Sequence, residues 1–416
     1  MQIDIKKIFT LTFFSTVLAL VAGPGWAQAI AEAPYLDESD PQIAYNEKDS
    51  EFLVIYRDPT GNIVGQIRDA YWSTVDDYVL LLSSGVTASF DHARVTYTYK
   101  PHTDARYFIT ALYTETSGPL PLKQLVVYAF DKSGNLEWGR TVRSTPNVAY
   151  NPDIVADNFE AYDCCLLVAW EEGVGQLKTQ VITASGTLQG SPNQINTGEA
   201  FHPSVAYQRS NDSFLVTYQR KTGPASELVA QRISSNNAPY PAQIVASLAE
   251  NPITAYGERY TTASEVAHNF TSNLSTVVWY DNEKYKARHL DGNASGSGPE
   301  MILFDGFLDV LDAIPGTPSV VAVPGSADMV AAYPTSYTRF IPPAPTTTTY
   351  HLSSKRISGM VLDFLSGFGS SPGVVFGGRL GFSDLSGYYV GVWEENELAG
   401  ASGGNSDVYG REHALP

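Results

Sequence analysis

The chain has 416 residues, with 44 Asp or Glu against 26 Lys or Arg and a formal net charge of −18. This acidic balance argues against binding to a nucleic-acid backbone, and a composition that is 43% apolar and only 17% charged excludes a disordered chain. Aromatic residues reach 12%, with 34 Gly and 25 Pro, which favours many short strands joined by turns.

Residues 1–29 have the pattern of an export signal. Lys6-Lys7 precedes an apolar run over residues 8–22, and Ala27-Gln28-Ala29 provides a small-x-small cleavage site. The run is about 15 residues long, shorter than the roughly 20 that a membrane-spanning helix needs, so a membrane anchor is the weaker alternative. No later apolar segment is long enough to span a membrane. We expect cleavage after Ala29 and a mature protein, residues 30–416, in the periplasm or outside the cell.

One pattern then recurs along the mature chain. A Pro precedes an apolar strand, a polar turn follows, and a second apolar strand ends in an aromatic residue. Clear copies are Pro41–Tyr56, Pro152–Trp170, Pro203–Tyr218 and Pro318–Tyr333, and weaker copies without the Pro are Ala93–Tyr113, Glu265–Trp279 and Val374–Trp393. The terminal aromatic residues follow one another at intervals of 48 to 61 residues. Such a period indicates a repeat architecture.

Later repeats continue with a third strand that carries a basic residue, as in Ala230-Gln231-Arg232, and a turn such as Ala184-Ser185-Gly186 leads to a fourth strand. Four short strands in about 55 residues describe a propeller blade. The first two strands are apolar on both faces, as expected between neighbouring sheets. The sequence therefore predicts an all-β fold, a seven-bladed β-propeller of four-stranded antiparallel blades. Six or eight blades remain alternatives, because the second and fifth repeats are irregular.

The last repeat ends with its third strand at Val408–His413, and no fourth strand follows. Ala33–Leu36, just before the first Pro, is the candidate for the missing strand. We therefore expect the mature N-terminal strand to close the ring, which removes open sheet edges. Residues 30–416 would then form a single propeller domain.

Repeats such as Pro203…Leu215-Val216-Thr217-Tyr218…Ala230-Gln231-Arg232 resemble those of secreted bacterial β-propeller proteins. The resemblance covers nearly the whole mature chain and implies the fold. It does not imply one function, because such propellers serve as binding scaffolds, adhesins and enzymes.

Motifs of catalysis are largely missing from the sequence. It contains no His-Glu-x-x-His, no phosphate-binding loop and no calcium loop of the usual spacing. The seven His are scattered without metal-ligand spacing. The segment Asp131–Trp138 resembles the Asp-box of sialidases, but its offsets differ and no Arg triad accompanies it. An ordinary Gly-containing hairpin explains this segment better.

An acidic residue follows the terminal aromatic residue by two positions in five of the seven repeats. These residues are Asp58, Glu115, Glu172, Asp281 and Glu395. The fourth and sixth repeats depart, with Arg220 and Thr335. One interpretation is a carboxylate ring at a mouth of the channel, which binds cations or basic groups, with calcium as the candidate ion. The other is structural, with each carboxylate accepting backbone N–H bonds in its own turn or in the next blade.

The sixth repeat carries an insertion, Pro334–Thr349, rich in Pro and Thr. One interpretation is a binding loop with Tyr337, Arg339 and Phe340 as contact residues, and the other is a solvated, polyproline-like excursion.

The two cysteines, Cys164 and Cys165, are adjacent at the start of a predicted second strand. They are either two buried thiols or a vicinal disulfide, since an exported protein meets an oxidising compartment. We expect no catalytic role for them.

Two functions remain. The preferred one is an exported, non-catalytic binding scaffold for a protein, a glycan or a surface polymer, with no nucleic-acid partner and no cofactor beyond candidate calcium. The alternative is a hydrolase or lyase that acts on polysaccharide with carboxylates at the propeller mouth, because glycoside hydrolysis needs two opposed carboxyl groups.

Overall fold

The computed structural model describes the parts of the chain given by the following ranges. They are residues 28–31, 39–83, 85, 87–98, 106–117, 121–145, 149–157, 165–173, 175–223, 225–249, 264–305, 312–313, 317–339, 347–358, 361–367, 374–383, 386–396 and 406–414. Apart from one short 3₁₀-helix, η1 (Arg209–Asn211), every regular element in these ranges is a β-strand. No helix in the described part could cross a membrane. The all-β prediction is confirmed.

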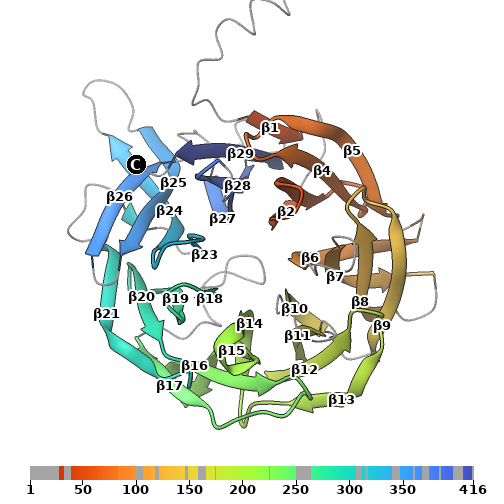
Figure 1. The fold of residues 1–416 in the computed structure, drawn as a ribbon, viewed down its shortest axis with the longest axis horizontal. Helices are drawn as coiled ribbons and strands as arrows, with labels where there is room; N and C mark the ends of the chain where they lie inside the picture. The colour runs from red at the N-terminus through yellow and green to blue at the C-terminus, as the bar shows by residue number, and fades with distance from the viewer. Residues whose placement is uncertain are drawn as a thin grey trace, which may run out of the picture.

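The described strands form seven sheets around a ring, and the fold is a β-propeller (Figure 1). The first to third sheets are β2 (Ser39–Asn46), β3 (Glu51–Arg57), β4 (Ile63–Asp69), β5 (Thr74–Leu82); β6 (Ala88–Thr98), β7 (Arg106–Glu115), β8 (Leu122–Asp131), β9 (Leu136–Thr145); and β10 (Ala149–Ala156), β11 (Cys165–Glu172), β12 (Gln176–Thr183), β13 (Leu188–Gln194). The fourth and fifth are β14 (Ala200–Gln208), β15 (Ser213–Thr222), β16 (Ala225–Ser234), β17 (Gln243–Leu248); and β18 (Glu265–Asn269), β19 (Leu274–Asp281), β20 (Lys284–Leu290), β21 (Gly296–Asp305). The sixth is β22 (Asp312–Ala313), β23 (Ser319–Ala322), β24 (Met329–Arg339), β25 (Thr347–Ser358), β26 (Val361–Gly367), and the seventh is β27 (Val374–Phe382), β28 (Tyr388–Asn396), β29 (Ser406–Ala414) with β1 (Gln28–Ala31).

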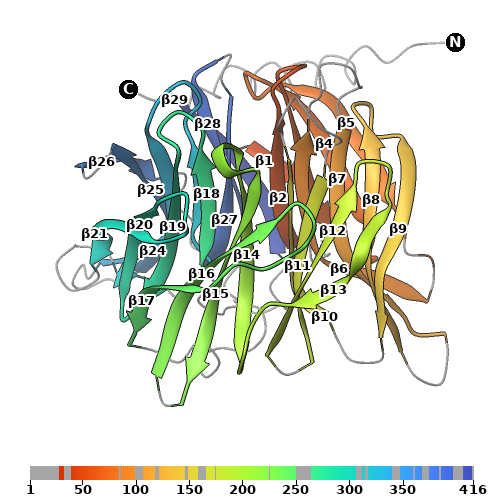
Figure 2. The same ribbon diagram turned by 60° about the horizontal axis from the view of Figure 1, so that its bottom comes forward.

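Within each sheet, the strand that comes first after the preceding blade lies nearest the channel, and the strands run between the two faces of the ring (Figures 1 and 2). All pairings are antiparallel. The expectation of uniform four-stranded blades is wrong for the sixth sheet, which has five strands. There, two short strands, β22 and β23, both pair with β24 at the inner position.

The closure of the ring also differs from the prediction. The outermost strand of the seventh sheet is β1, which pairs with β29 through Gln28–Gly410, Ala29–Tyr409 and Ala31–Val408. The expected strand Ala33–Leu36 lies outside the described residues. An N-terminal segment therefore pairs with the last strand, as predicted, but it lies earlier in the chain than expected. It also spans the expected cleavage site after Ala29, so that site and this strand compete for the same residues.

The seams between sheets hold the hydrophobic core. The buried apolar side chains of the described chain form seven clusters, and each cluster joins two neighbouring sheets. The aromatic residue that ends a second strand packs toward the preceding sheet, as Trp170, Tyr218 and Trp279 do with at most 1% exposure. Full burial of one such side chain stabilises the fold by about 1.5–3 kcal/mol. This explains why the repeat retains an aromatic residue there.

The second sheet is the exception at this position. Arg94 pairs with Thr110 in register, as Asp153 pairs with Ala169 in the third sheet, so the counterpart of Trp170 is Ala111. The seam between the first and second sheets thus receives a methyl group where other seams receive a ring. Tyr113 and Tyr128 pack against this cluster from the side.

The hairpin interpretation of Asp131–Trp138 agrees with the structure. The Asp131 Oδ1 atom accepts hydrogen bonds from the backbone N–H groups of Ser133 and Asn135, both at 2.9 Å. Asp291 caps the equivalent turn of the fifth sheet in the same way, through Asn293 and Ser295. The side chain of Asp131 therefore organises its own turn.

We expect loss of β1 to destabilise the ring. A chain that begins at Glu32 should have a free energy of unfolding, measured in urea, about 2 kcal/mol below that of a chain that begins at Gln28. The reason is that the three residue pairs between β1 and β29 are lost and β29 becomes an open edge. Equal unfolding free energies would show that β1 does not close the ring. Mass spectrometry of exported protein would show whether cleavage spares this strand.

Candidate functional site

In three of the predicted acidic residues, the carboxylate is bound by neighbouring groups of the protein. Asp58 accepts the backbone N–H groups of Thr60 and Asn62 within its own turn, both at 2.9 Å. Glu172, 8% exposed, forms a bidentate ion pair with Arg143 at 2.7 and 3.1 Å. The contacts of Asp58 are those of the structural interpretation, whereas the partner of Glu172 is a side chain of the preceding sheet.

Asp281 is still more enclosed, with a side chain 4% exposed. Its Oδ2 atom lies 2.7 Å from Lys286 Nζ, and its Oδ1 atom accepts the backbone N–H of Ala249 at 2.7 Å. The carboxylate therefore connects two successive sheets. A ligand-binding role for these acidic residues stays a prediction.

Glu115 does not occupy the same register as the others. Glu172 lies three residues beyond Ala169, the partner of Asp153, whereas Glu115 lies five residues beyond Thr110, the partner of Arg94. The true counterpart of Glu172 is Tyr113. The sequence alignment took Tyr113 as the terminal aromatic residue of its repeat, because Ala111 offered none. Glu115 instead accepts the hydroxyl of Ser117 at 2.5 Å.

The remaining predicted residues are placed by their backbone. Glu395 lies on β28 and pairs with Val375 and Asp407. Tyr337 and Arg339 are not in an irregular loop, since β24 continues to Arg339 and pairs with β25 as far as Arg339–Thr347. Phe340 lies outside the described residues, as does Cys164. Cys165 is half-buried and begins β11, at the opposite end from Glu172.

Sequence analysis missed a set of polar residues on the innermost strands. Each pairs with the residue of the second strand that directly precedes the aromatic position of its repeat. We call this set the inner ring, and it consists of Gln42, Arg94, Asp153, Ser204, Glu265, Ser319 and Arg379. The residue after the Pro of the repeat occupies this position, but the type of its side chain differs from blade to blade. Because the side chains differ, the sequence pattern did not reveal the ring.

Side chains of the inner ring join one innermost strand to the next. The backbone N–H of Val205 donates to Asp153 Oδ2 at 2.8 Å, and that of Val266 donates to Ser204 Oγ at 3.2 Å. Each donor lies on the sheet that follows its acceptor. Without these acceptors, backbone N–H groups on the inner edges would lack partners.

Inner-ring side chains also connect the innermost strands of the fifth, sixth and seventh sheets. The hydroxyl of Ser319 accepts the backbone N–H of Leu380 at 3.1 Å and donates to Glu265 Oε1 at 3.1 Å. Glu265 also forms an ion pair with Arg379. Both inner-ring carboxylates, Asp153 and Glu265, are thus held by contacts between sheets.

A β-bulge precedes the inner ring in several sheets. The pairing register shifts just before Gln42, Arg94, Asp153 and Ser204. Two residues before each of these stands a non-glycine residue with positive φ, and these residues are Asp40 (56°), His92 (50°), Asn151 (45°) and His202 (54°). Recurrent strain of this kind is tolerated only where the surrounding structure fixes it.

Surrounding contacts do fix two of these strained residues. Glu171 Oε1 accepts the side-chain amide of Asn151 at 2.8 Å and the backbone N–H of His202 at 2.7 Å. Burial lowers the pKa of His202, the nearby Glu171 opposes this, and His92 adds to the lowering. His202 is therefore a neutral imidazole at neutral pH.

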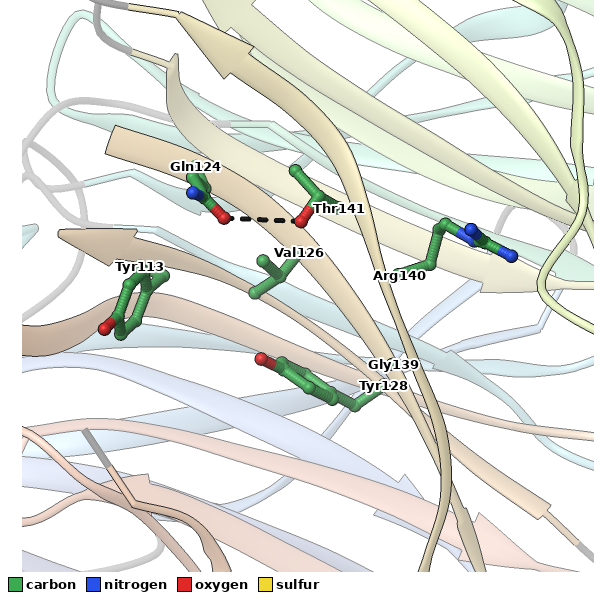
Figure 3. Close-up of a pocket in the computed structure, with 7 residues that line it drawn as sticks. All are labelled: Tyr113, Gln124, Val126, Tyr128, Gly139, Arg140 and Thr141. Atoms are coloured by element: carbon green, nitrogen blue, oxygen red, sulfur yellow. Dashed lines mark hydrogen bonds between the residues drawn. The ribbon is translucent and has the colours of Figure 1, made fainter. Parts of the chain in front are cut away.

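A separate cavity of about 230 Å³ lies on the second sheet, on the face toward the first. The described residues that line it are Tyr113, Gln124, Val126, Tyr128, Gly139, Arg140 and Thr141 (Figure 3). Val126 is the strand partner of Ala111, so the cavity lies beside the position where this seam lacks its aromatic residue. Thr141 is exposed, which leaves this side open to solvent.

Apart from Arg140, the polar side chains that line the cavity are neutral. Thr141 Oγ1 donates to Gln124 Oε1 at 3.3 Å, as the dashed line in Figure 3 marks. Arg140 points away from the two tyrosines in that view, and its Nε donates to the carbonyl of Gly186 at 2.8 Å. Gly139 is required here, because a Cβ atom at that position would lie 2.6 Å from the Tyr128 ring.

Among the described residues, no three His, Cys, Asp or Glu side chains gather in a way that would hold a metal ion. A calcium site stays a prediction.

Comparisons with known proteins assign the chain to no family. No protein-family model matches the chain, and no curated protein matches it. Structures that resemble it include the Dos1 propeller, with 10% identity, coverage of 94% of this chain and 95% of that one, and a TM-score of 0.46. Another is the lectin of Aleuria aurantia, described as a six-bladed propeller with a novel mode of fucose recognition, with 10% identity, coverage of 79% and 94%, and a TM-score of 0.45.

A third is a mutant of the NanB sialidase from Streptococcus pneumoniae, with 8% identity, coverage of 95% and 72%, and a TM-score of 0.47. Whereas the Aleuria lectin is described as six-bladed, the described part of the present chain forms seven sheets. Similarity at this level does not extend to function.

The local contacts of the acidic residues predict how their loss acts. Asp281→Asn should lower the free energy of unfolding by about 2 kcal/mol, because half-buried Lys286 loses its partner at 2.7 Å and keeps only Glu300, at 3.8 Å. Glu172→Gln should cost about 1 kcal/mol, because Arg143 is partly exposed. Urea unfolding measures both losses, which should add because the residues lie on different sheets.

A calcium titration followed by melting temperature is the companion measurement. With locally paired carboxylates, we expect no rise in the wild type. A rise that both substitutions abolish would favour the carboxylate ring instead.

Proposed function

We propose that the protein is an exported, non-catalytic binding propeller and that its ligand is a glycan, of which one neutral sugar ring occupies the cavity beside Tyr113 and Tyr128. The observation that carries this proposal is the lining of that cavity, which combines aromatic rings with hydrogen-bonding groups of which Arg140 alone is charged. Export rests on the signal pattern of residues 1–29 alone.

The chemistry of the lining suits a sugar. Tyrosine presents a flat apolar face for the C–H groups of a pyranose and a hydroxyl for its oxygens. Burial raises the pKa of Tyr128, and the neighbouring Tyr113 raises it further, so its hydroxyl stays protonated as a neutral donor. The amide N–H groups of Gln124 have no partner among the described residues and are available to sugar hydroxyls.

The size of the cavity is consistent with a small ligand. Its volume of about 230 Å³ is below the roughly 300–1,000 Å³ of sites that hold drug-sized molecules. A single saccharide unit, with the remainder of a polymer outside, fits this dimension. Thr141, which is exposed on β9, lies where the rest of such a saccharide chain would extend from the cavity into solvent.

Binding is favoured over hydrolysis because of where the carboxylates are. No Asp, Glu or His is among the described residues that line the cavity, whereas glycoside hydrolysis requires two carboxyl groups on opposite sides of the bond. In the inner ring, Asp153 accepts two backbone N–H groups and Glu265 is paired with Arg379. Neither is arranged as a free proton donor.

A glycan array on the purified protein identifies the sugar, and calorimetric titration with that sugar then tests the site. We expect Gln124→Ala and Tyr113→Ala each to weaken binding about tenfold, the cost of a lost hydrogen bond or ring contact. The matched control is Gln176→Ala, because Gln176 pairs with Glu172 as Gln124 pairs with Tyr113. Equal affinity in all variants would exclude the cavity as the site.

The same samples test the alternative function. Reducing-end release from polysaccharides should stay at the background level for the wild type. Release that disappears in folded Glu265→Gln would show that the protein is a hydrolase and would overturn the non-catalytic assignment.

A further inference from the structure

Three polar side chains connect the third and fourth sheets near the start of the innermost strands β10 and β14. Glu171 Oε1 accepts the side-chain amide of Asn151 at 2.8 Å and the backbone N–H of His202 at 2.7 Å. The amide nitrogen of Asn151 also lies 3.2 Å from His202 Nδ1. An amide nitrogen can only donate, so Nδ1 accepts this bond and the neutral ring carries its proton on Nε2. We call Asn151, Glu171 and His202 the seam latch.

A proton on His202 Nδ1 is incompatible with these contacts. Nδ1 would become a donor and would face the amide donor of Asn151, so the hydrogen bond between these two side chains would be lost. Glu171 Oε1, at 3.8 Å from Nδ1, already accepts two N–H groups. The seam latch therefore holds a neutral ring, and its contacts must rearrange when the ring is protonated.

The seam latch also fixes two strained backbone positions. Asn151 and His202 have positive φ angles of 45° and 54°, and each stands two residues before a member of the inner ring, Asp153 or Ser204. Asp153 Oδ2 accepts the backbone N–H of Val205 at 2.8 Å across the same seam. Strain of this kind persists only where surrounding contacts fix it, so release of the seam latch should weaken the hydrogen bond at Val205.

Within the described chain, the titratable groups that act on His202 are the carboxylate of Glu171 on β11 and the imidazole of His92 on β6. Burial of His202 lowers its pKa most, Glu171 opposes this, and His92 adds to the lowering. Charged groups elsewhere on the strands that pack against β14 have partners of their own. They are Asp153, Glu172, Lys178, Arg220, Lys221 and Glu265.

We propose that the seam latch is a pH-sensitive contact, which holds the third and fourth sheets together at neutral pH and is released in mildly acidic surroundings when His202 takes up a proton. Once the latch is open, the imidazole regains its ordinary pKa of about 6.5. Because the pKa of His202 is lowered in the closed state, the open state binds more protons at acidic pH. The closed latch is therefore stable above this ordinary pKa and loses stability as the pH falls below it. The proposal is independent of the cavity at Tyr113, which lies in the seam between the first and second sheets.

Hydrogen exchange on the full mature chain at about pH 7.5 and about pH 5.5 tests the seam latch, with each rate divided by the intrinsic exchange rate at that pH. In the wild type, protection of the Val205 amide should fall by about fivefold at the lower pH, the equivalent of one hydrogen bond. His202→Asn should abolish this fall, because the Asn side chain offers an acceptor, tolerates a positive φ and does not titrate. The Val266 amide, which Ser204 holds in the next seam, should keep its protection at both pH values in both proteins.

His268→Asn is the matched control, because it makes the same change at another buried histidine. His268 Nδ1 contacts Ser275 Oγ at 3.0 Å within the fifth sheet, and burial lowers the pKa of His268 to about 4. This variant should show the same pH-dependent loss at Val205 as the wild type. An equal loss in the wild type and His202→Asn would overturn the seam latch and assign the effect to Asp153, whose pKa is raised by burial. Constant protection of Val205 in the wild type would overturn it as well.

Asn151→Gly provides a second test if His202→Asn does not fold. Glycine adopts a positive φ without strain and removes the amide donor, so Val205 should have low protection already at the higher pH. Protection equal to that of the wild type at both pH values would contradict a latch through Asn151. Nitrogen NMR of the His202 ring gives a direct check, since a proton on Nδ1 at neutral pH would also contradict it.

Discussion

Every innermost strand of a propeller has an edge that faces the channel, where no further strand can pair with it. Backbone N–H groups on that edge must still find acceptors, because an unpaired buried donor costs free energy. In this protein, side chains of the inner ring supply acceptors for the next sheet, as Asp153, Ser204 and Ser319 do for Val205, Val266 and Leu380. The ring of sheets depends on these hydrogen bonds at its centre and on apolar packing in its seams.

This constraint accounts for features that a repeat alone would not require. A bulge and a residue with positive φ precede the inner ring in several sheets, and both aim the ring side chain at the next strand. The acceptor need only be a carboxylate or a hydroxyl, so its identity is free to vary between blades. Arg94 and Arg379 are positions where the ring holds a donor instead of an acceptor.

The seams impose the second constraint. An aromatic residue at the end of the second strand fills the space toward the preceding sheet, and Ala111 breaks this rule in the second sheet. The cavity beside Val126 follows from that substitution in the repeat. A binding site at this seam would therefore be the consequence of a single small side chain where the pattern provides a large one.

The sequence predicted the repeat because proline and aromatic residues mark the strands whose burial is greatest, as at Pro203 and Tyr218. It misplaced Glu115, because the second repeat has Ala111 at the aromatic position and Tyr113, two residues later, was taken in its place. It did not find the inner ring, because Arg94, Asp153 and Ser204 occupy equivalent positions in their sheets but have side chains of different chemical types. It placed the closing strand at the wrong residues, because Gln28–Ala31 also has the pattern of a cleavage site. In addition, β1 pairs with a strand at the other end of the chain, and such a distant pairing leaves no local pattern in the sequence.

Hydrogen exchange measured amide by amide tests the central role of the inner ring most directly. In Ser204→Ala, the Val266 amide loses its acceptor, and the account predicts exchange about fivefold faster there, since one hydrogen bond is worth roughly 1 kcal/mol. The Val205 amide, which Asp153 holds in the preceding seam, should keep its protection. Unchanged protection of Val266, or equal loss at both amides, would contradict the account.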